Sequence, residues 1–256
     1  MAQEAAEETP FGLVTGTSSG IGLAVAETLL RRGWEVVGVA RRPAPIHHAR
    51  YRHVRLDLAD TARLEAEFEG SLGDELRLRG RSRVGLVNGA ATLEPVGSTS
   101  TLPATGLARA FALNSVAPIW LVGFFLRRAR GAKLRVVDVS SGAARHPYAG
   151  WSAYCASKAA LRMAGEVIGA ESREFAPGTA LPTDLSVVSY EPGVVDTEMQ
   201  QAVRGSLAEA FPHVKRFLDL HRSGQLHPPS IPASEIADLL ESDGLPAYSE
   251  RRLGGG

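Results

Sequence analysis

Three polar side chains are spaced as an acid–base group would be. Tyr154 and Lys158 lie four residues apart in the stretch YCASK, and Ser141 lies thirteen residues before the tyrosine. Positions i and i+4 share one face of a helix, so the ammonium group is held near the phenol. A nearby cation favours the phenolate and lowers the pKa of the phenol toward neutrality. A serine hydroxyl can hold a carbonyl oxygen while negative charge develops on it. The three residues therefore predict proton transfer to a carbonyl.

A glycine-rich turn gives the second chemical signal. The stretch TGTSSGIG, residues 15–22, follows an apolar run and opens a helical pattern. Glycine allows a tight turn and a close approach of the backbone, and the free N–H groups of a helix N-terminus bind a pyrophosphate. The turn predicts a dinucleotide site, and the residues expected to form it are Gly16, Ser18, Ser19, Gly20, Ile21 and Gly22.

Two arginines indicate which dinucleotide to expect. Chains that bind NAD in this way carry an Asp or Glu about 20 residues after the glycine turn, where it binds the ribose 2′-hydroxyl. Here the second apolar run ends in Arg41 and Arg42, and Glu35 lies at the opposite end of that run. Guanidinium groups bind a phosphate well, which predicts NADPH or NADP+ as the cofactor. The alternative is a solvated pair of surface arginines.

The elements that must position these residues alternate along the chain. Strands are expected at 11–16, 34–40, 51–58, 83–89, 133–141 and 185–193, and helices at 20–33, 62–72, 107–129 and 153–172. The strands are continuous apolar runs, which is typical of a parallel sheet covered on both faces. Their order predicts an α/β fold of the Rossmann type, a doubly wound parallel sheet with helices on both faces.

Residues 1–256 are expected to form a single domain of this type. We expect residues 1–9 to be a disordered tail and Pro118 to kink the long helix. The segment 196–232 is too long for a simple connection, so it predicts a helical lid or substrate loop.

Composition limits the partners and the compartment. Lys plus Arg and Asp plus Glu are equal at 28 each, which gives no support for nucleic acid or an anionic membrane as a partner. No apolar run approaches the roughly 20 residues that span a bilayer. Cys155 is the single cysteine, which excludes an internal disulfide framework and fits the cytoplasm. The histidines show no metal-ligand spacing, so no metal is expected.

Seven short motifs, taken together, resemble the short-chain dehydrogenase/reductase family. In chain order they are TGxxxGIG from Thr15, Asp57–Leu58, LVNGAA around Asn88, Asn114, Ser141, YxxxK from Tyr154 to Lys158, and Pro192–Gly193. Two longer stretches, HPYAGWSAYCASKAAL and YEPGVVDTEMQQ, are similar to the sepiapterin reductase and bacterial benzil reductase branch of the family.

The resemblance implies an NADPH-dependent reduction of a ketone or a 1,2-diketone, with hydride from the nicotinamide and a proton from Tyr154. It implies that Lys158 also binds the nicotinamide ribose, and that Asn114 organises a helix and a water that relays protons to Lys158. Tyr154 would border the nicotinamide as well. Further cofactor contacts are implied at Asp57, Leu58, Asn88, Gly89, Ala90, Pro192, Gly193, Val194, Val195 and Thr197.

The substrate is less sharply defined than the cofactor. His146 and Trp151 flank the serine and the tyrosine in sequence and would line the substrate pocket with them, packing being the alternative. Sepiapterin reductases anchor the pterin with an acidic residue near the C-terminus, and Glu250 is only a loose counterpart. This favours a diketone. A dehydrogenase for another alcohol or ketone class and a catalytically silent NADPH-binding regulator remain alternatives.

Assembly can also be predicted. The expected helices 107–129 and 153–172 carry more apolar surface than one sheet face can cover, and in the family these helices pair across a two-fold axis. The last strand, which commonly forms tetramers in the family, is expected to be missing. A homodimer is therefore predicted.

Overall fold

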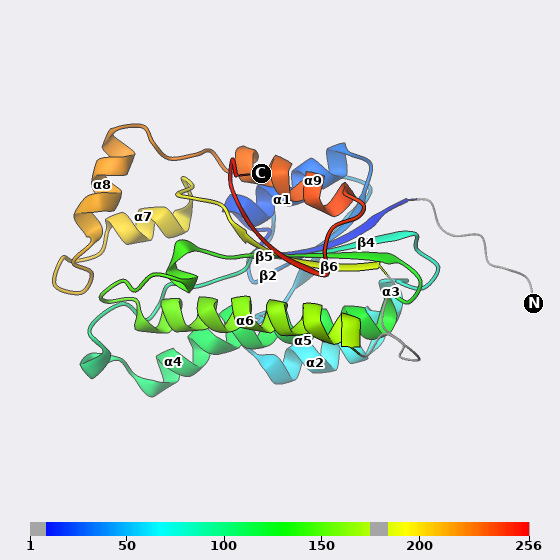
Figure 1. Cartoon of the computed structure of the whole chain (residues 1–256), viewed down its shortest axis with the longest axis horizontal. Helices are drawn as coiled ribbons and strands as arrows, with labels where there is room; N and C mark the ends of the chain where they lie inside the picture. The colour runs from blue at the N-terminus through cyan, green and yellow to red at the C-terminus, as the bar shows by residue number, and fades with distance from the viewer. Residues whose placement is uncertain (1–8, 175–183, 256) are drawn as a thin grey trace, which may run out of the picture.

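A computed structural model of the chain describes residues 9–174 and 184–255. The expected tail at 1–9 therefore lies almost wholly outside the described residues. Within them, parallel strands form one sheet in the order β3-β2-β1-β4-β5-β6-β7 (Figure 1). The strands are β1 Phe11–Thr15, β2 Glu35–Ala40, β3 Tyr51–Arg55, β4 Arg83–Asn88, β5 Lys133–Val139, β6 Asp184–Glu191 and β7 Tyr248–Arg252.

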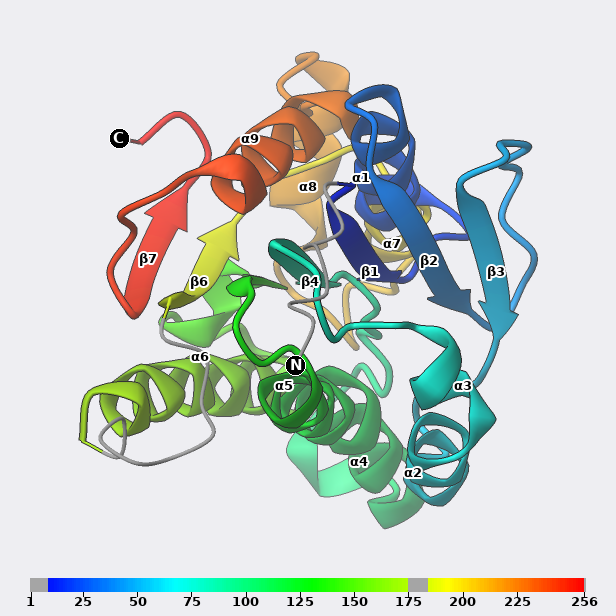
Figure 2. The same cartoon turned by 90° about the vertical axis from the view of Figure 1, so that its right-hand side faces the viewer.

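Helices cover both faces of this sheet, as the sequence predicts (Figures 1 and 2). One face carries α1 (Gly20–Arg31) and α9 (Ser230–Glu241). The other face carries α2 (Thr61–Glu69), α3 (Ser71–Glu75), α4 (Ala104–Phe111), α5 (Ala117–Arg128) and α6 (Ser152–Glu174). Because each central strand is buried on both sides, its residues alternate between two cores, and Val136 and Val137 of β5 lie in different ones.

The order of the strands reverses between β1 and β4. The chain runs outward from β1 to β3 and then crosses back to β4 on the other side of β1. In such sheets a ligand binds outside the carboxyl ends of the strands, at the point of reversal. The glycine turn after β1 and the loop after β4 meet there, since a Cβ added to Gly16 would lie 2.9 Å from the backbone nitrogen of Ala90.

The long helix expected at 107–129 is interrupted, although not by Pro118. A π-helical segment, η2 (Ala112–Val116), separates α4 from α5 and is centred on Asn114. Pro118 lies in the first turn of α5, where a missing N–H is tolerated. The stretch Ala104–Arg128 is long and apolar enough to cross a membrane by length and composition. It lies against the sheet, and 56% of its apolar window is buried, as in the core helices of soluble proteins.

The C-terminal third departs most from the expectations. The segment 196–232 contains α7 (Glu198–Arg204) and α8 (Val214–Arg222), which lie beyond the carboxyl ends of the strands (Figure 1). The expected absence of a last strand is wrong, because β7 pairs in parallel with β6 from Val187↔Tyr248 to Glu191↔Arg252. The sequence YSERR of β7 is polar, as an edge strand can be, so it shows no apolar run. The other strands end up to three residues earlier than expected.

Candidate active site

The tyrosine and the lysine lie in the first turns of α6, above the end of β5. Lys158 donates a hydrogen bond from Nζ to the carbonyl oxygen of Val139 at 2.6 Å. Its Nζ lies 5.9 Å from the centroid of the Tyr154 ring. Both side chains are buried, with 3% and 7% of their surface exposed. The i, i+4 spacing thus brings the two groups together as predicted.

Ser141 completes the arrangement from the loop after β5. It begins the short helix η3 (Gly142–Ala144), and its Oγ accepts the backbone N–H of Ala143 at 3.1 Å. Burial raises the pKa of Tyr154 to about 12, and the hydrogen bond with Ser141 opposes that rise. The expected lowering toward neutrality is therefore wrong for the chain alone. The desolvation penalty of a phenolate at this position is larger than the stabilisation that neighbouring hydrogen bonds and charges give it.

Asp138 is a further buried charge beside the lysine, and the sequence reasoning missed it. Asn88 donates a hydrogen bond from Nδ2 to Oδ1 of Asp138 at 2.7 Å. Burial raises the pKa of Asp138 to about 6, against the effects of Asn88 and Lys158. Burial also lowers the pKa of Lys158 to about 8, and the charge of Asp138 opposes that fall. A charged residue in an apolar strand could have marked Asp138 as a functional candidate in the sequence. Arg135 in the same strand is a second such residue, but it pairs with Asp184 and not with Lys158.

Asn114 is fully buried in the π-helical segment, and its amide is fully used. It accepts the N–H of Thr92 and donates to the carbonyl of Thr92, both at 2.9 Å, and it donates to Oγ of Ser157 at 3.0 Å. The residue thus ties the loop after β4 to α6, next to Lys158. Organising a helix is what the geometry supports, while the relay water stays a prediction.

The glycine turn fits a pyrophosphate. Gly16 and Gly20 have φ values of +80° and +60°, which favour glycine. A Cβ on Gly22 would lie 2.5 Å from the carbonyl oxygen of Gly16, so the turn admits no side chain there. Ser19 precedes α1 without a side-chain capping bond, which leaves the first N–H groups of the helix open to an anion. Ser18 and Ile21 belong to the same turn.

Arg41 and Arg42 both follow β2, but their surroundings differ. Among the described residues the guanidinium of Arg41 has no hydrogen bond or ion pair. It lines a hollow of about 440 Å³ together with Arg55, Leu56, Asp57 and Arg63. Arg42 instead donates from Nη2 to Oε2 of Glu198 at 2.6 Å and to Oγ of Ser19 at 3.4 Å.

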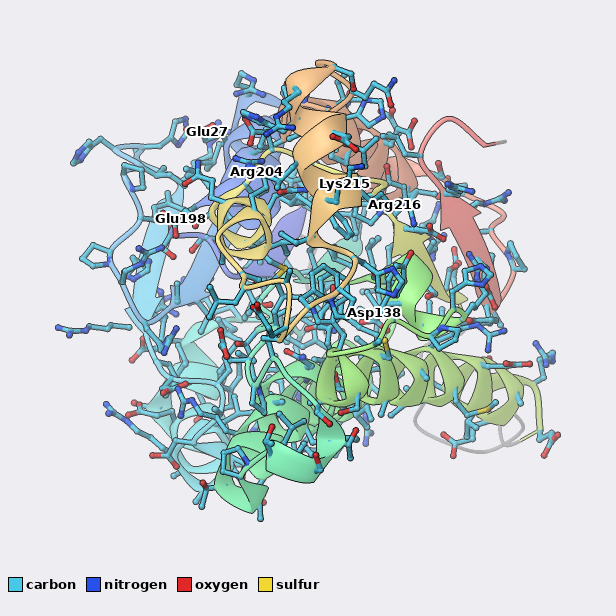
Figure 3. All side chains as sticks on the ribbon, turned by 90° about the vertical axis from the view of Figure 1, so that its left-hand side faces the viewer. Glu27, Asp138, Glu198, Arg204, Lys215 and Arg216 are labelled. Atoms are coloured by element: carbon cyan, nitrogen blue, oxygen red, sulfur yellow. The ribbon has the colours of Figure 1, made fainter. Side chains whose placement is uncertain are left out.

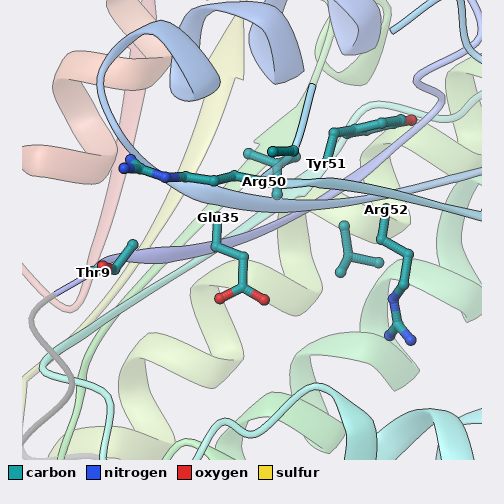
Figure 4. A pocket seen from close by; sticks show the side chains of 8 residues that line it. Thr9, Glu35, Arg50, Tyr51 and Arg52 are labelled. Atoms are coloured by element: carbon teal, nitrogen blue, oxygen red, sulfur yellow. The ribbon is translucent and has the colours of Figure 1, made fainter. Parts of the chain in front are cut away.

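Glu35 lies at the amino end of β2, as expected, and pairs with Arg81 at 2.7 Å. Glu35 lines a separate hollow of about 300 Å³. Figure 4 shows it there with Thr9, Arg50, Tyr51 and Arg52. This hollow lies at the opposite end of the strands from Ser141, Tyr154 and Lys158. Glu35 therefore cannot take the place of an acid after β2.

The remaining predicted cofactor residues follow β3, β4 and β6, at the carboxyl edge of the sheet. Asp57 accepts a hydrogen bond from Arg109 at 2.8 Å, and Leu58 is buried beside it. Gly89 and Ala90 donate their N–H groups to Oγ1 of Thr15 at 3.0 and 3.1 Å. These bonds fix the loop after β4 against the glycine turn.

The loop after β6 leads from Pro192 through Val194 and Val195 into α7. Gly193 in this loop has a φ of +70°. Thr197 caps α7 by accepting the N–H of Gln200 at 3.2 Å. Its methyl carbon would lie 3.2 Å from a Cβ on Gly20, so the start of α7 borders the glycine turn.

An aromatic cluster joins Tyr154 to the segment between α7 and α8. Trp151 stacks on Phe211 at 4.3 Å and meets the ring of Tyr154 edge-on at 5.6 Å. Tyr148 and Phe217 also contact Trp151. The Nε1 of Trp151 is buried without a hydrogen-bond partner in the described part of the chain.

Two residues considered for the substrate lie apart from this cluster. His146 is exposed, and its backbone carbonyl is near the thiol of Cys155. Glu250 is engaged by Arg145 and Arg162 and by the hydroxyl of Tyr248. The carboxylate of Glu250 is thus not free to anchor a ligand. In the described ranges, no three His, Cys, Asp or Glu residues are grouped to hold a metal ion.

Comparison with known proteins shows the family. The family model for short chain dehydrogenases matches residues 11–207. A benzil reductase ((S)-benzoin forming) of Bacillus subtilis (strain 168) is 35% identical over 233 residues, which cover 90% of this chain and 92% of that protein. A sepiapterin reductase of Bos taurus is 31% identical over 223 residues, covering 85% and 74%.

The solved structures agree on the fold. The crystal structure of the KRED1-Pglu enzyme matches with a TM-score of 0.78 at 29% identity, covering 94% of this chain and 100% of that one. These matches show the family of the chain, and its strand order, glycine turn and Asn114–Ser141–Tyr154–Lys158 group are consistent with that family. The chain belongs to the short-chain dehydrogenase family and is an oxidoreductase that uses a nicotinamide cofactor.

Proposed function

We propose that the enzyme is an NADPH-dependent carbonyl reductase that acts on ketones and, among them, on 1,2-diketones. The observation that carries the proposal is the position of two hydroxyls, that of the buried Tyr154 near the start of α6 and that of the half-buried Ser141 after β5, close enough to interact. A pair of hydroxyls held in this way can bind one carbonyl oxygen from two sides.

The chemistry follows from where each proton is held. A bound nicotinamide supplies the hydride. Tyr154 stays protonated near neutral pH because burial raises the pKa of its phenol to about 12, and it gives its proton to the alkoxide oxygen. Ser141 accepts from Ala143 at Oγ, so its own O–H is free to donate to the same oxygen. Lys158, a buried cation, stabilises the phenolate that remains and is the route by which Tyr154 regains its proton.

The surroundings of this group favour an aromatic substrate over a pterin. The cluster of Trp151, Phe211, Tyr148 and Phe217 gives an apolar, aromatic border next to Tyr154. Glu250, the only counterpart considered for a pterin anchor, is held by two arginines. The relatives from Bacillus subtilis and Bacillus cereus are named benzil reductases, which supports an aryl diketone.

The preference for NADPH rests on charge at the far end of the groove. The guanidinium of Arg41 has no hydrogen-bond or ion-pair partner in the described chain and borders a hollow with two more arginines, Arg55 and Arg63. A 2′-phosphate carries nearly two negative charges, and charge-assisted hydrogen bonds are the strong ones. No carboxylate follows β2 to accept the 2′-hydroxyl of NAD.

The test is an NADPH oxidation assay with benzil and a panel of other ketones, and with chiral analysis of the product. Turnover of benzil to benzoin, with acetophenone-type monoketones slower, supports the proposal. Oxidation of NADPH only by another carbonyl class would favour the alternative of a different substrate. NADPH binding without turnover of any ketone would favour the silent regulator, which a complete Tyr–Lys–Ser–Asn group argues against.

We further propose a cytoplasmic homodimer. Four apolar side chains are exposed on η2, α5 and α6: Val116, Ile119, Met163 and Val167. Covering them would explain why these helices are apolar on their outer side. Light scattering should give a dimer for the wild type and a monomer for Val167→Lys. Leu207→Lys, at an exposed apolar residue elsewhere, should remain dimeric.

A further inference from the structure

The ion pair between Arg42 and Glu198 links the loop after β2 to the start of α7. Arg42 follows β2, and Glu198 is the first residue of α7, 156 positions later in the chain. Figure 3 shows Glu198 on the side of α7 that faces the blue strands of the sheet. Oε2 of the glutamate accepts from Nη2 of Arg42 at 2.6 Å, and Ser19 of the glycine turn also contacts both side chains.

The ion pair lies where the adenosine end of a dinucleotide would pass. The start of α7 borders the glycine turn, because the methyl of Thr197 would lie 3.2 Å from a Cβ on Gly20. Ser19 stands at the N-terminus of α1, whose open N–H groups suit a pyrophosphate. A phosphate on the adjacent ribose 2′-oxygen would therefore approach Arg42 from the side that Glu198 now occupies.

The two arginines are thus not equivalent. The guanidinium of Arg41 has no hydrogen-bond or ion-pair partner in the described chain and is available at once. For Arg42 to bind a phosphate, its ion pair with Glu198 must first break, and the freed carboxylate of Glu198 would then repel the phosphate. Both side chains of the pair are more than half exposed, so the exchange is inexpensive and reversible.

We propose that Glu198 is a specificity-determining residue that competes with the 2′-phosphate of NADPH for Arg42. Binding of the phosphate takes over Arg42 and releases the first turn of α7, while a cofactor without the phosphate leaves the ion pair intact. This inference rests on the proposed use of NADPH. It adds that Glu198 lowers the affinity of the chain for that cofactor, because it occupies Arg42.

The test separates the phosphate from the rest of the cofactor. Dissociation constants for 2′,5′-ADP and 5′-AMP are measured by calorimetry for the wild type, Glu198→Gln and Glu27→Gln. Neither probe carries a nicotinamide, so neither reaches Tyr154. Glu27 is an exposed acid on α1 without an ion pair among the described residues, and its change is the matched control for the loss of one charge.

Glu198→Gln should bind 2′,5′-ADP about two- to fivefold more tightly than the wild type, the range of one exposed ion pair. Its affinity for 5′-AMP should not change, and Glu27→Gln should match the wild type for both probes. In an Arg42→Ala background, Glu198→Gln should lose most of its effect. Unchanged or weaker binding of 2′,5′-ADP by Glu198→Gln would overturn the inference. A wild type that binds both probes equally would instead overturn the proposed preference for NADPH, and the inference with it.

Discussion

The two ends of the cofactor groove are built in different ways. At the catalytic end Asn114, Tyr154 and Lys158 are at most 7% exposed, and the bonds of Asn114 to Ser157 and of Lys158 to Val139 are made to buried partners. At the phosphate end the side chains of Arg42 and Glu198 are 61% and 57% exposed. Water thus competes for every contact at the phosphate end and for almost none at the catalytic end.

This difference decides how each end responds to change. A buried polar group that loses its partner costs about 1–3 kcal/mol, whereas an exposed ion pair contributes about 0–1 kcal/mol. The catalytic end is therefore fixed in place, and its pKa values are set by desolvation. The phosphate end is exposed to solvent, and we expect single charges there to change the choice of cofactor.

The largest effect is expected at the catalytic end. Tyr154→Phe keeps the ring that packs against Trp151 and removes only the proton donor. We expect kcat to fall by at least about 100-fold, the lower end for loss of general acid catalysis. Fluorescence titration should show NADPH binding little changed. Near-normal turnover by this variant would show that the proton comes from elsewhere.

Asp138→Asn tests whether desolvation governs that end. The folded pKa of Asp138, about 6, lies above its usual value of 3.8, so the folded chain holds this proton more tightly than the unfolded chain. The stability that this gives is present below pH 3.8 and is lost as the pH rises through about 6.

The amide that replaces the carboxyl group in this variant does not titrate. The wild type should therefore lose stability relative to the variant over this pH range, by about 3 kcal/mol. Urea unfolding of both proteins at a series of pH values measures the difference. The hydrogen bond from Asn88 can persist in the variant, which makes the comparison a test of charge. A difference that is constant with pH would mean that Asp138 is not desolvated as described.

At the phosphate end, Arg41→Asp should reverse the cofactor preference. The wild type should favour NADPH over NADH by more than about tenfold in kcat/KM, since each charge-assisted bond to the phosphate contributes about 1.5–3 kcal/mol before costs. The aspartate removes a cation and offers an acceptor to the 2′-hydroxyl of NADH. Equal use of both cofactors by the wild type would mean that the arginines are merely solvated.

Ionic strength should give the smallest effect and should separate the two ends. The Debye length is about 10 Å at 0.1 M salt, so exposed charges are screened and buried ones are not. Raising the salt should increase the KM for NADPH by a few-fold, with little change in the KM for NADH or in kcat. A fall in kcat of the same size would show that the catalytic end is also open to solvent.

The sequence predicted the parts of the site that local periodicity determines. Tyr154 and Lys158 are four apart on one helix, and Ser141 follows the end of a strand, so their meeting needs only the standard α/β layout. The continuous apolar strands in alternation with helices likewise predicted the parallel sheet. At these positions the structure favoured by the local sequence pattern is the one found in the fold.

What the sequence did not predict depends on contacts between distant segments. Glu198 reads as an ordinary acid at the start of a helix, and only the fold brings it to Arg42. The π-helical turn at Asn114 depends on Thr92, 22 residues away, and it took the place of a kink expected at Pro118. β7 was missed because its residues alternate little in hydropathy and are half-solvated at the edge of the sheet.

Both outer strands of the sheet are unusual in their arginine content. β3 carries Arg52 and Arg55, and β7 carries Arg251 and Arg252, whereas the strands between them are mostly apolar. An edge strand exposes unpaired backbone groups, which can recruit another chain and grow into fibrous aggregates. A strand added to either edge would have to strip water from these guanidinium groups and bring like charges together. The positive charge on both edge strands therefore disfavours the pairing of a further strand with either edge of the sheet.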